Sequence, residues 1–270
     1  MRGLLLFFLL NIIIQSSAQD KRDYWEAYLA QYDKGVGSIL VNMSLKENAP
    51  ILEFPFLLSA RVKINHCSAE GLPEQDGWDN LYKISDKIKA EIDSHIPSIA
   101  PGVFTYQCWR TDYYYIRDTT GVRQQLTTVF KDFFPDQEYK IEFRSDSSWA
   151  AYLTFLYPNE ETLEYISNEK VLSQLMESGD KLIKARKIDH WLYFKTETGR
   201  SKFIIYATEQ GFKVESQENG QNKERNFSLR LSRTDKVDIK SISAITLQLK
   251  RKARQYGGDY DGWETFVIKE

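Results

Sequence analysis

The sequence predicts an α+β protein made of two ferredoxin-like domains, the first with an extra N-terminal β-hairpin. Three observations favour this fold class. Short segments alternate apolar and polar residues, which is typical of strands with one buried face. Other segments repeat apolar residues every three or four positions, which is typical of one face of a helix. From residue 56 the elements run strand, helix, strand, strand, helix, strand, and this ferredoxin-like order returns after residue 187.

The extra hairpin is expected before the first ferredoxin-like set. An aromatic-rich strand at residues 24–32 turns through the glycines of segment 34–37 into a second strand at residues 38–41. The segment 47–50 ends this pairing with a proline. We expect the two strands to widen the sheet of the first domain.

The first ferredoxin-like set opens with a strand from Phe56 to Ile64 in which every second residue is apolar. A helix follows, because apolar residues recur at helical spacing from Trp78 to Ile92 before Pro97 ends it. The remaining elements expected here are strands at residues 103–110 and 112–117, a helix from 120 that stops at Pro135, and strands at 139–144 and 148–156.

The second set follows a mostly polar stretch, residues 157–170, which is a suitable domain boundary. It begins with a leading helix through residues 171–176 that ends at Gly179. The elements expected after it are a strand at 187–195, a helix at 200–210, strands at 212–216 and 227–231, a helix at 239–253 and a strand at 263–268.

The first residues predict a secretory signal peptide. Arg2 supplies a positive start, residues 4–14 are almost wholly apolar, and small residues lead to a cleavage site after Ala18. This run is shorter than the roughly 20 residues that a membrane-spanning helix needs. We therefore expect an exported bacterial protein, periplasmic or extracellular, with no transmembrane segment in the mature chain; an uncleaved anchor is the alternative. The expected parts are a signal peptide at 1–18 and domains at 19–157 and 165–270.

The charge balance argues against direct binding of nucleic acid. The formal net charge is -2, which is a poor electrostatic match for a polyphosphate. The run Tyr113–Tyr115 lies on an expected strand, but Asp112 and Asp118 flank it with the wrong sign for an RNA-binding sheet. Buried and half-buried tyrosines are the expected explanation.

Two cysteines, Cys67 and Cys108, invite a disulfide in an oxidising compartment. In a ferredoxin-like sheet they would lie near the ends of two strands that have a third between them. That places them roughly 10 Å apart, beyond the roughly 7 Å that a disulfide spans. The bridge therefore requires a different strand order, and the sequence leaves the pairing open.

No catalytic, cofactor or metal-binding site is predicted. His66 beside Cys67 is an isolated adjacency, whereas a zinc site needs several ligands at short spacings. The segment 178–181 has the Ser-x-x-Lys spacing of penicillin-binding enzymes but lies where a helix ends. The glycines of 35–37 lie in a hairpin, and paired carboxylates such as those at 160–161 are common in a chain this acidic. The sequence predicts a protein without enzymatic activity.

The most distinctive segments are 189–194 and 257–265, which combine large aromatic residues with glycines. Glycines permit a tight turn or close approach of another backbone. Aromatic side chains beside such turns would supply anchors for a partner. The alternative is that the second segment closes the sheet and caps the core. The candidate partner-binding residues are His190, Trp191, Tyr260, Asp261 and Trp263.

These segments resemble the family named regulator of ribonuclease E activity B, an inhibitor of the endonuclease that starts messenger decay. The similarity is carried in order by residues 177–180, 186–191 and 260–263, and it extends over roughly 165–270. It implies a ferredoxin-like domain that binds a protein. Residues from Tyr24 through 71–73 to Tyr115 resemble the domain of unknown function family 695, which has no assigned activity.

These observations give a leading hypothesis and two alternatives. The leading hypothesis is a non-enzymatic, exported binding or regulatory protein that needs no cofactor and binds a protein partner. A cytoplasmic regulator of ribonuclease activity is the first alternative, and it requires that the signal peptide is not used. An envelope hydrolase is the second, and it requires two carboxylates about 5–10 Å apart in a cleft. The sequence predicts neither the identity of the partner nor the oligomeric state.

Overall fold

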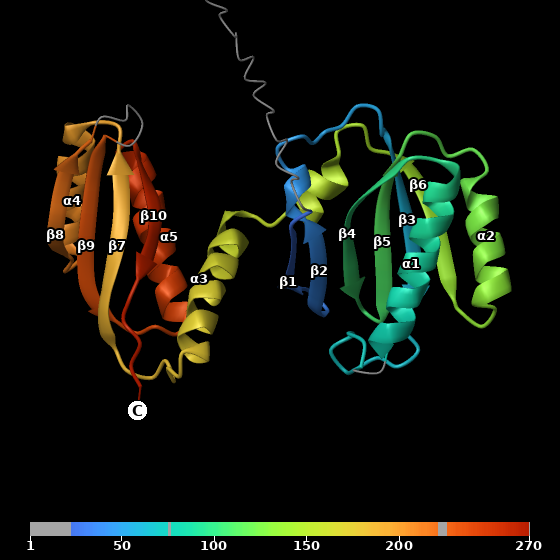
Figure 1. The fold of residues 1–270 in the computed structure, drawn as a ribbon, viewed down its shortest axis with the longest axis horizontal. Helices are drawn as coiled ribbons and strands as arrows, with labels where there is room; N and C mark the ends of the chain where they lie inside the picture. The colour runs from blue at the N-terminus through green and yellow to red at the C-terminus, as the bar shows by residue number, and fades with distance from the viewer. Residues whose placement is uncertain (1–22, 75–76, 221–225, 270) are drawn as a thin grey trace, which may run out of the picture. The chain divides into compact units, whose positions relative to one another are not determined.

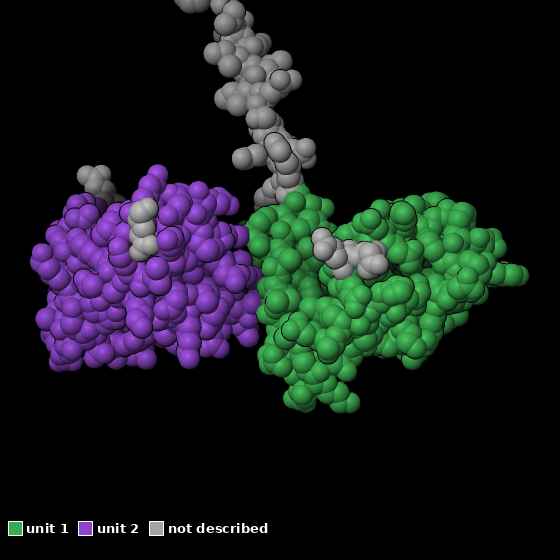
Figure 2. Space-filling model, turned by 90° about the horizontal axis from the view of Figure 1, so that it is seen from below, with its two compact units in different colours: residues 1–156 green, residues 157–270 purple. Residues whose placement is uncertain are grey.

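The computed structural model describes residues 23–74, 77–220 and 226–269. The chain divides into two compact units, residues 1–156 and 157–270 (Figures 1 and 2). Each unit has its own antiparallel sheet and its own helices, which confirms two α+β units. The predicted signal peptide lies outside the described residues.

Unit 1 contains a six-stranded antiparallel sheet in the order β1-β2-β4-β5-β3-β6. The expected hairpin is present and pairs with β4, so it widens the sheet. The elements are β1 (Trp25–Tyr32), β2 (Gly35–Asn42), η1 (Met43–Leu45), β3 (Phe56–Lys63), α1 (Trp78–His95), β4 (Ser98–Tyr106), β5 (Trp109–Ile116), α2 (Val122–Phe133), β6 (Tyr139–Ser145) and η3 (Ala151–Leu156).

The core of unit 1 lies between the sheet and the helices α1 and α2. Alternate residues of β3, namely Leu58, Ala60 and Val62, point into it and are fully buried. The stripes predicted on the two helices meet them, with Ile84 on α1 and Leu126 on α2 also fully buried. The other residues of each strand therefore form a second face, opposite these two helices.

The segment predicted as a strand at residues 148–156 is instead the short π-helix η3. The carboxylate of Asp146 accepts hydrogen bonds from the backbone N–H groups of Ala150 and Ala151 at 2.8 and 2.9 Å, which starts the helical turn. The indole of Trp149 stacks on Tyr115 with ring centroids 3.9 Å apart. The apolar run therefore packs across the second face of the sheet rather than extending its edge.

Unit 2 contains a four-stranded antiparallel sheet in the order β10-β7-β9-β8. Side chains of Asn159, Thr196 and Asp238 each accept a backbone hydrogen bond and so begin the three helices. The elements are α3 (Glu160–Glu177), β7 (Arg186–Phe194), α4 (Glu197–Glu209), β8 (Lys213–Asn219), β9 (Phe227–Asp235), α5 (Ile239–Gln255) and β10 (Gly258–Glu264).

Cys67 and Cys108 form a disulfide, with Cα atoms 5.7 Å apart. The sequence argument against this bridge was wrong because it placed Cys108 within a strand. Cys108 lies in the turn between β4 and β5, and β5 is the direct neighbour of β3. The N–H of Ile64, just after β3, donates to the carbonyl oxygen of Cys108 at 2.8 Å. The bridge therefore joins two chain segments at one end of adjacent strands.

Candidate functional site

Among the described residues of unit 2, no helix packs on one face of the sheet, and we call this the open face. The helices α4 and α5 pack on the other face, against residues such as Leu192 and Leu231. Because side chains alternate along a strand, Asp189 and Trp191 on β7 point to the open face. The strand pairing places the following residues on this face: Lys187, Asp189, Trp191, Tyr193, Lys213, Glu215, Ser216, Glu218, Ser228, Arg230, Ser232, Thr234, Asp259, Gly262 and Glu264.

The five predicted partner-binding residues are divided between two environments. His190 is fully buried, Trp263 is 9% exposed, and Tyr260 is half-buried beside them, all on the helix-covered side. Trp191 is half-buried on the open face, and Asp261 is exposed where β10 shifts register. The expectation of a single exposed aromatic cluster was wrong for His190 and Trp263, because they occupy the core positions of adjacent strands.

Trp263 belongs to a buried hydrogen-bond network that joins β10 to two helices. Its indole N–H donates to the side-chain oxygen of Asn168 at 2.8 Å. The amide nitrogen of Asn168 donates in turn to the hydroxyls of Ser243 and Thr246, each at 3.0 Å. All three polar partners are buried. This geometry gives Trp263 a structural role in the core of unit 2.

His190 is held as a neutral imidazole. Burial, and then the positive charge of Arg233, lowers the pKa of His190 to about 3. Its Nδ1 lies 2.9 Å from the hydroxyl oxygen of Tyr260, and its Nε2 has no hydrogen-bond partner among the described residues. A histidine with this pKa carries no charge near neutral pH, so it is unsuited to acid–base chemistry there.

Charged side chains form a network across the open face. The ammonium of Lys187 lies 3.3 Å from Asp189 and 3.2 Å from Glu215. The hydroxyl of Ser232 donates to Glu215 at 2.7 Å, and this bond, followed by Lys187, lowers the pKa of Glu215 to about 2. The carboxylate is therefore ionised at neutral pH. Sequence reasoning missed Lys187, Glu215 and Ser232, although the strand expected at 187–195 already put Lys187 on the same face as Trp191.

The open face carries more negative than positive groups. Trp191 lies near its centre, directly across from Arg230 of β9. The charged residues are the carboxylates Asp189, Glu215, Glu218, Asp259 and Glu264 and the cations Lys187, Lys213 and Arg230. An acidic surface with a half-exposed indole at its centre is suited to binding a basic protein surface.

The described part of the chain contains neither a metal site nor a membrane-spanning helix of the kinds considered below. No group of three or more His, Cys, Asp or Glu residues there is placed to hold a metal ion. No helix within the same residues has both the length and the apolar character needed to cross a membrane.

Comparison with known families matches each unit separately. Residues 23–157 match a family of unknown function (DUF695), which covers half of the chain. Residues 165–265 match the family described as Regulator of ribonuclease activity B. Both matches agree with the resemblances found in the sequence. They place Trp191 and the rest of the open face inside the second matched region.

Comparison with individual proteins adds little. No curated protein matches the chain. A solved structure described as an unknown protein from Galdieria sulphuraria aligns with 78% of this chain and 98% of its own, at 10% identity and a TM-score of 0.21. A similarity at that level supports no conclusion about fold or function.

Proposed function

We propose that this protein regulates a ribonuclease by binding it, because the chain belongs to the family of unknown function (DUF695) and continues into a unit similar to Regulator of ribonuclease activity B. In this proposal the protein acts without catalysis of its own, and the open face of unit 2 is the binding surface. The observation that carries the proposal is the excess of carboxylates around Trp191 within the matched region.

The chemistry of the partner follows from its substrate. An enzyme that binds RNA neutralises phosphates with lysine and arginine side chains. A surface rich in carboxylates, such as Asp189 and Glu215, is complementary to that basic surface and would compete with RNA for it. Trp191 would supply the central anchor, since large aromatic residues dominate the energy of protein interfaces.

The strand order supports a ferredoxin-like assignment for both units. In unit 2 the first strand of the set, β7, lies between β9 and the last strand, β10. In unit 1 the equivalent strand β3 lies between β5 and β6. Each set follows the βαββαβ order along the chain. We propose that unit 1 is the same fold with the hairpin β1-β2 added at the β4 edge.

Export is part of the proposal. The charge, apolar run and small residues of positions 1–18 support a cleaved signal peptide. The Cys67–Cys108 disulfide is an independent support, because such bridges persist mainly in oxidising compartments. We propose that the partner of the exported form is an exported ribonuclease. The cytoplasmic alternative requires that the signal peptide is not used.

The test measures cleavage of a fluorescent single-stranded RNA by envelope and cytoplasmic fractions of the host, with the purified protein added. We expect the wild type to slow cleavage in one fraction, less so at high salt. Trp191→Ala should weaken inhibition about tenfold or more. The control Tyr165→Ala removes a residue that is 39% exposed on α3, outside the open face, and should inhibit normally. The free RNA should show no anisotropy change with the protein alone.

Two results would contradict the proposal. The first is unchanged cleavage in every fraction, and the second is equal inhibition by the wild type and Trp191→Ala. Sequencing the N-terminus of the native protein then decides the compartment. A mature chain that starts at Gln19 outside the cytoplasm supports export, whereas an intact Met1 in the cytoplasm supports the alternative.

A further inference from the structure

Unit 1 contains a groove of about 640 Å³ on the face of its sheet opposite α1 and α2. Its volume lies within the roughly 300–1,000 Å³ that is usual for small-molecule sites. The floor is formed by cross-strand neighbours, since Ser59 of β3 pairs with Tyr113 of β5 and Arg61 pairs with Thr111. The groove shares no residue with the open face of unit 2 and belongs to the region matched by the family of unknown function.

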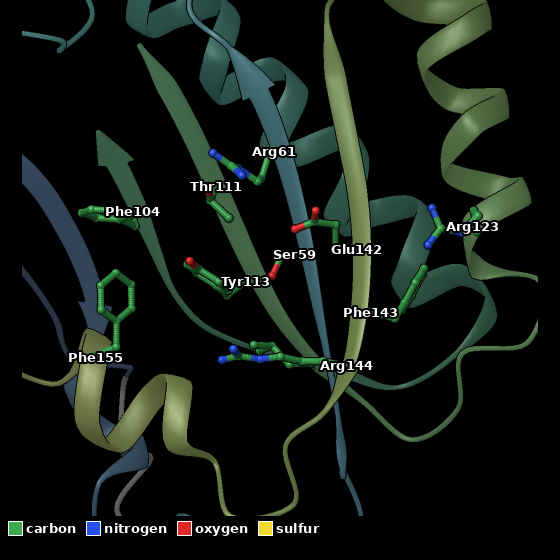
Figure 3. A pocket seen from close by; sticks show the side chains of 11 residues that line it. Ser59, Arg61, Phe104, Thr111, Tyr113, Arg123, Glu142, Phe143, Arg144 and Phe155 are labelled. Atoms are coloured by element: carbon green, nitrogen blue, oxygen red, sulfur yellow. The ribbon is translucent and has the colours of Figure 1, made fainter. Parts of the chain in front are cut away.

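One wall of the groove is aromatic. The π-helix η3 brings Phe155 over the sheet, where its ring packs edge-on against Phe104 with centroids 5.0 Å apart. Phe155 also contacts the ring of Tyr113 at 6.4 Å. All three rings are half-buried, so they leave apolar surface exposed to the groove. Figure 3 shows Arg61, Tyr113 and Arg144 directed to the same side of the sheet as Phe104 and Phe155.

The other wall is positively charged. The guanidinium groups of Arg61 and Arg144 line the groove together with Tyr113. Burial raises the pKa of Tyr113, and these two positive charges oppose that rise. Glu142 is the one carboxylate among the described residues that line the groove. The carboxylate pair of the hydrolase alternative is therefore not found in this groove.

Several polar groups in the groove have unused hydrogen-bonding capacity. Within the described chain, Arg61 has no hydrogen bond or ion pair, and its guanidinium packs over the ring of Trp109 at 5.2 Å. Arg144 approaches an acid only at 3.9 Å, where Asp146 already accepts hydrogen bonds from Tyr115 and Ala151. The hydroxyls of Ser59, Thr111 and Tyr113 likewise have no hydrogen-bond partner among the described residues, although Thr111 is only 5% exposed.

We propose that this groove binds a small organic anion that carries a planar ring, of the nucleoside monophosphate class. Guanidinium groups such as those of Arg61 and Arg144 match the oxygen geometry of a phosphate. The hydroxyls on the floor would donate to the remaining phosphate oxygens and to ribose. The base would stack against Phe155 and Phe104, as bases do on aromatic side chains. The site uses no residue of the open face and does not depend on the proposed regulation of a ribonuclease.

The test is isothermal titration calorimetry of the intact protein with AMP, adenosine and inorganic phosphate. We expect saturable AMP binding with a Kd below about 1 mM. Adenosine and inorganic phosphate should each bind at least about tenfold more weakly than AMP. Adenosine lacks the phosphate that the arginines would bind, and inorganic phosphate lacks the base that would stack on the aromatic rings. A single-stranded oligonucleotide is the competitor that separates a mononucleotide site from an extended RNA-binding face.

Substitutions in the groove test whether AMP binds there. Arg144→Gln changes a side chain that is 61% exposed, so folding should be preserved and AMP affinity should fall about tenfold. Phe155→Leu should weaken AMP and adenosine by similar factors, because it removes the stacking surface that both use. The matched control is Arg251→Gln on α5, which changes an arginine of similar exposure, 57%, and should leave AMP affinity unchanged.

Three results would overturn the proposal. The first is no saturable binding of AMP, and the second is binding that Arg144→Gln and Phe155→Leu leave intact. The third is competition by the oligonucleotide that strengthens with its length, which would identify an RNA-binding face instead. If Phe155→Leu unfolds, Arg144→Gln with its control decides alone.

Discussion

Three consecutive tyrosines in β5 lie in three different environments. Tyr113 lines the groove, Tyr114 is buried under the helices, and Tyr115 stacks on Trp149 while its hydroxyl donates to Asp146 at 2.7 Å. The sequence predicted their alternation correctly. The same alternation puts Asp112 on the face of Tyr114 and not on that of Tyr113. The acidic neighbour was therefore wrongly used as an argument against a site on the face of Tyr113.

Trp263→Ala should destabilise unit 2 by about 3–5 kcal/mol. The change opens a cavity in the core and leaves the side-chain oxygen of Asn168 without its indole donor. Trp191→Ala removes a half-exposed side chain from the open face and should cost about 1 kcal/mol or less. Urea unfolding followed by hydrogen exchange in each unit measures both. Equal stability of the two variants would contradict the structural role assigned to Trp263.

The buried pair of Asp180 and Arg186 predicts acid sensitivity of unit 2. Hydrogen bonds from the Arg186 guanidinium, then from the N–H groups of Ile268 and Leu182, hold the pKa of Asp180 well below its usual value. A depressed pKa stabilises the fold at any pH above the carboxyl's unfolded value. That stabilisation is lost as the pH falls toward the folded pKa.

The measurement is the free energy of unfolding of unit 2 from pH 7 to pH 2. The wild type should lose stability steadily below about pH 4. Asp180→Asn should be less stable by about 3–5 kcal/mol at pH 7, because Arg186 stays buried without its carboxylate. Below about pH 4, the free energy of unfolding of this variant should also change less with pH than that of the wild type. If both proteins lost stability equally as the pH fell, the pair would not be the cause of the acid sensitivity.

At the scale of elements, helices were predicted more reliably than the segment 148–156. The apolar stripes of α1 and α5 depend on local periodicity, and their central residues, such as Ile88 and Leu249, are buried as expected. The form of η3 depends on partners far away in sequence, since Tyr115 supplies the ring on which Trp149 stacks. A contact over such a separation leaves no periodic signal in the segment itself.

Asp146→Ala should loosen η3 and the groove together. The carboxylate accepts hydrogen bonds from Ala150, Ala151 and Tyr115, so its loss leaves buried donors without partners and should destabilise unit 1 by about 2–3 kcal/mol. The expected result is a lower urea midpoint and faster hydrogen exchange across 146–156. Ser148→Ala is the control, because its hydroxyl makes one long bond of 3.5 Å. Unaltered exchange across this segment would refute the role of Asp146.

The candidate sites also show where sequence reasoning ends. Glycines and aromatic residues pointed to β10 and β7, and Trp191 and Asp261 do lie at the surface. The same pattern included His190 and Trp263, because composition does not reveal which face of a strand the helices cover. The groove in unit 1 gave no signal in the sequence, since its residues come from four strands, α2 and η3, and only the folded sheet brings them together.

At the scale of the whole molecule, the two units should respond differently to a reducing agent. The disulfide lies in unit 1 and closes a segment with a sequence separation of 41, for which the chain-entropy estimate is about 4 kcal/mol. Replacing both Cys67 and Cys108 by serine should lower the stability of unit 1 by about 2–4 kcal/mol. The stability of unit 2 should not change.

Hydrogen exchange during urea unfolding, read separately for peptides of each unit, tests this expectation. The wild type treated with reducing agent should match the double serine variant, and oxidised wild type should differ from both in unit 1 alone. A shift of equal size in unit 2 would mean that the two units unfold as one cooperative body.

The position of the disulfide also has a mechanical consequence. The covalent loop between Cys67 and Cys108 encloses α1 and β4, so a force that pulls on the chain ends is carried across the bridge and bypasses both elements. Full extension of oxidised unit 1 should therefore release a contour shorter by about 140 Å than that of the reduced unit, at about 3.4 Å for each sheltered residue. Oxidation thus sets how far this protein stretches under load.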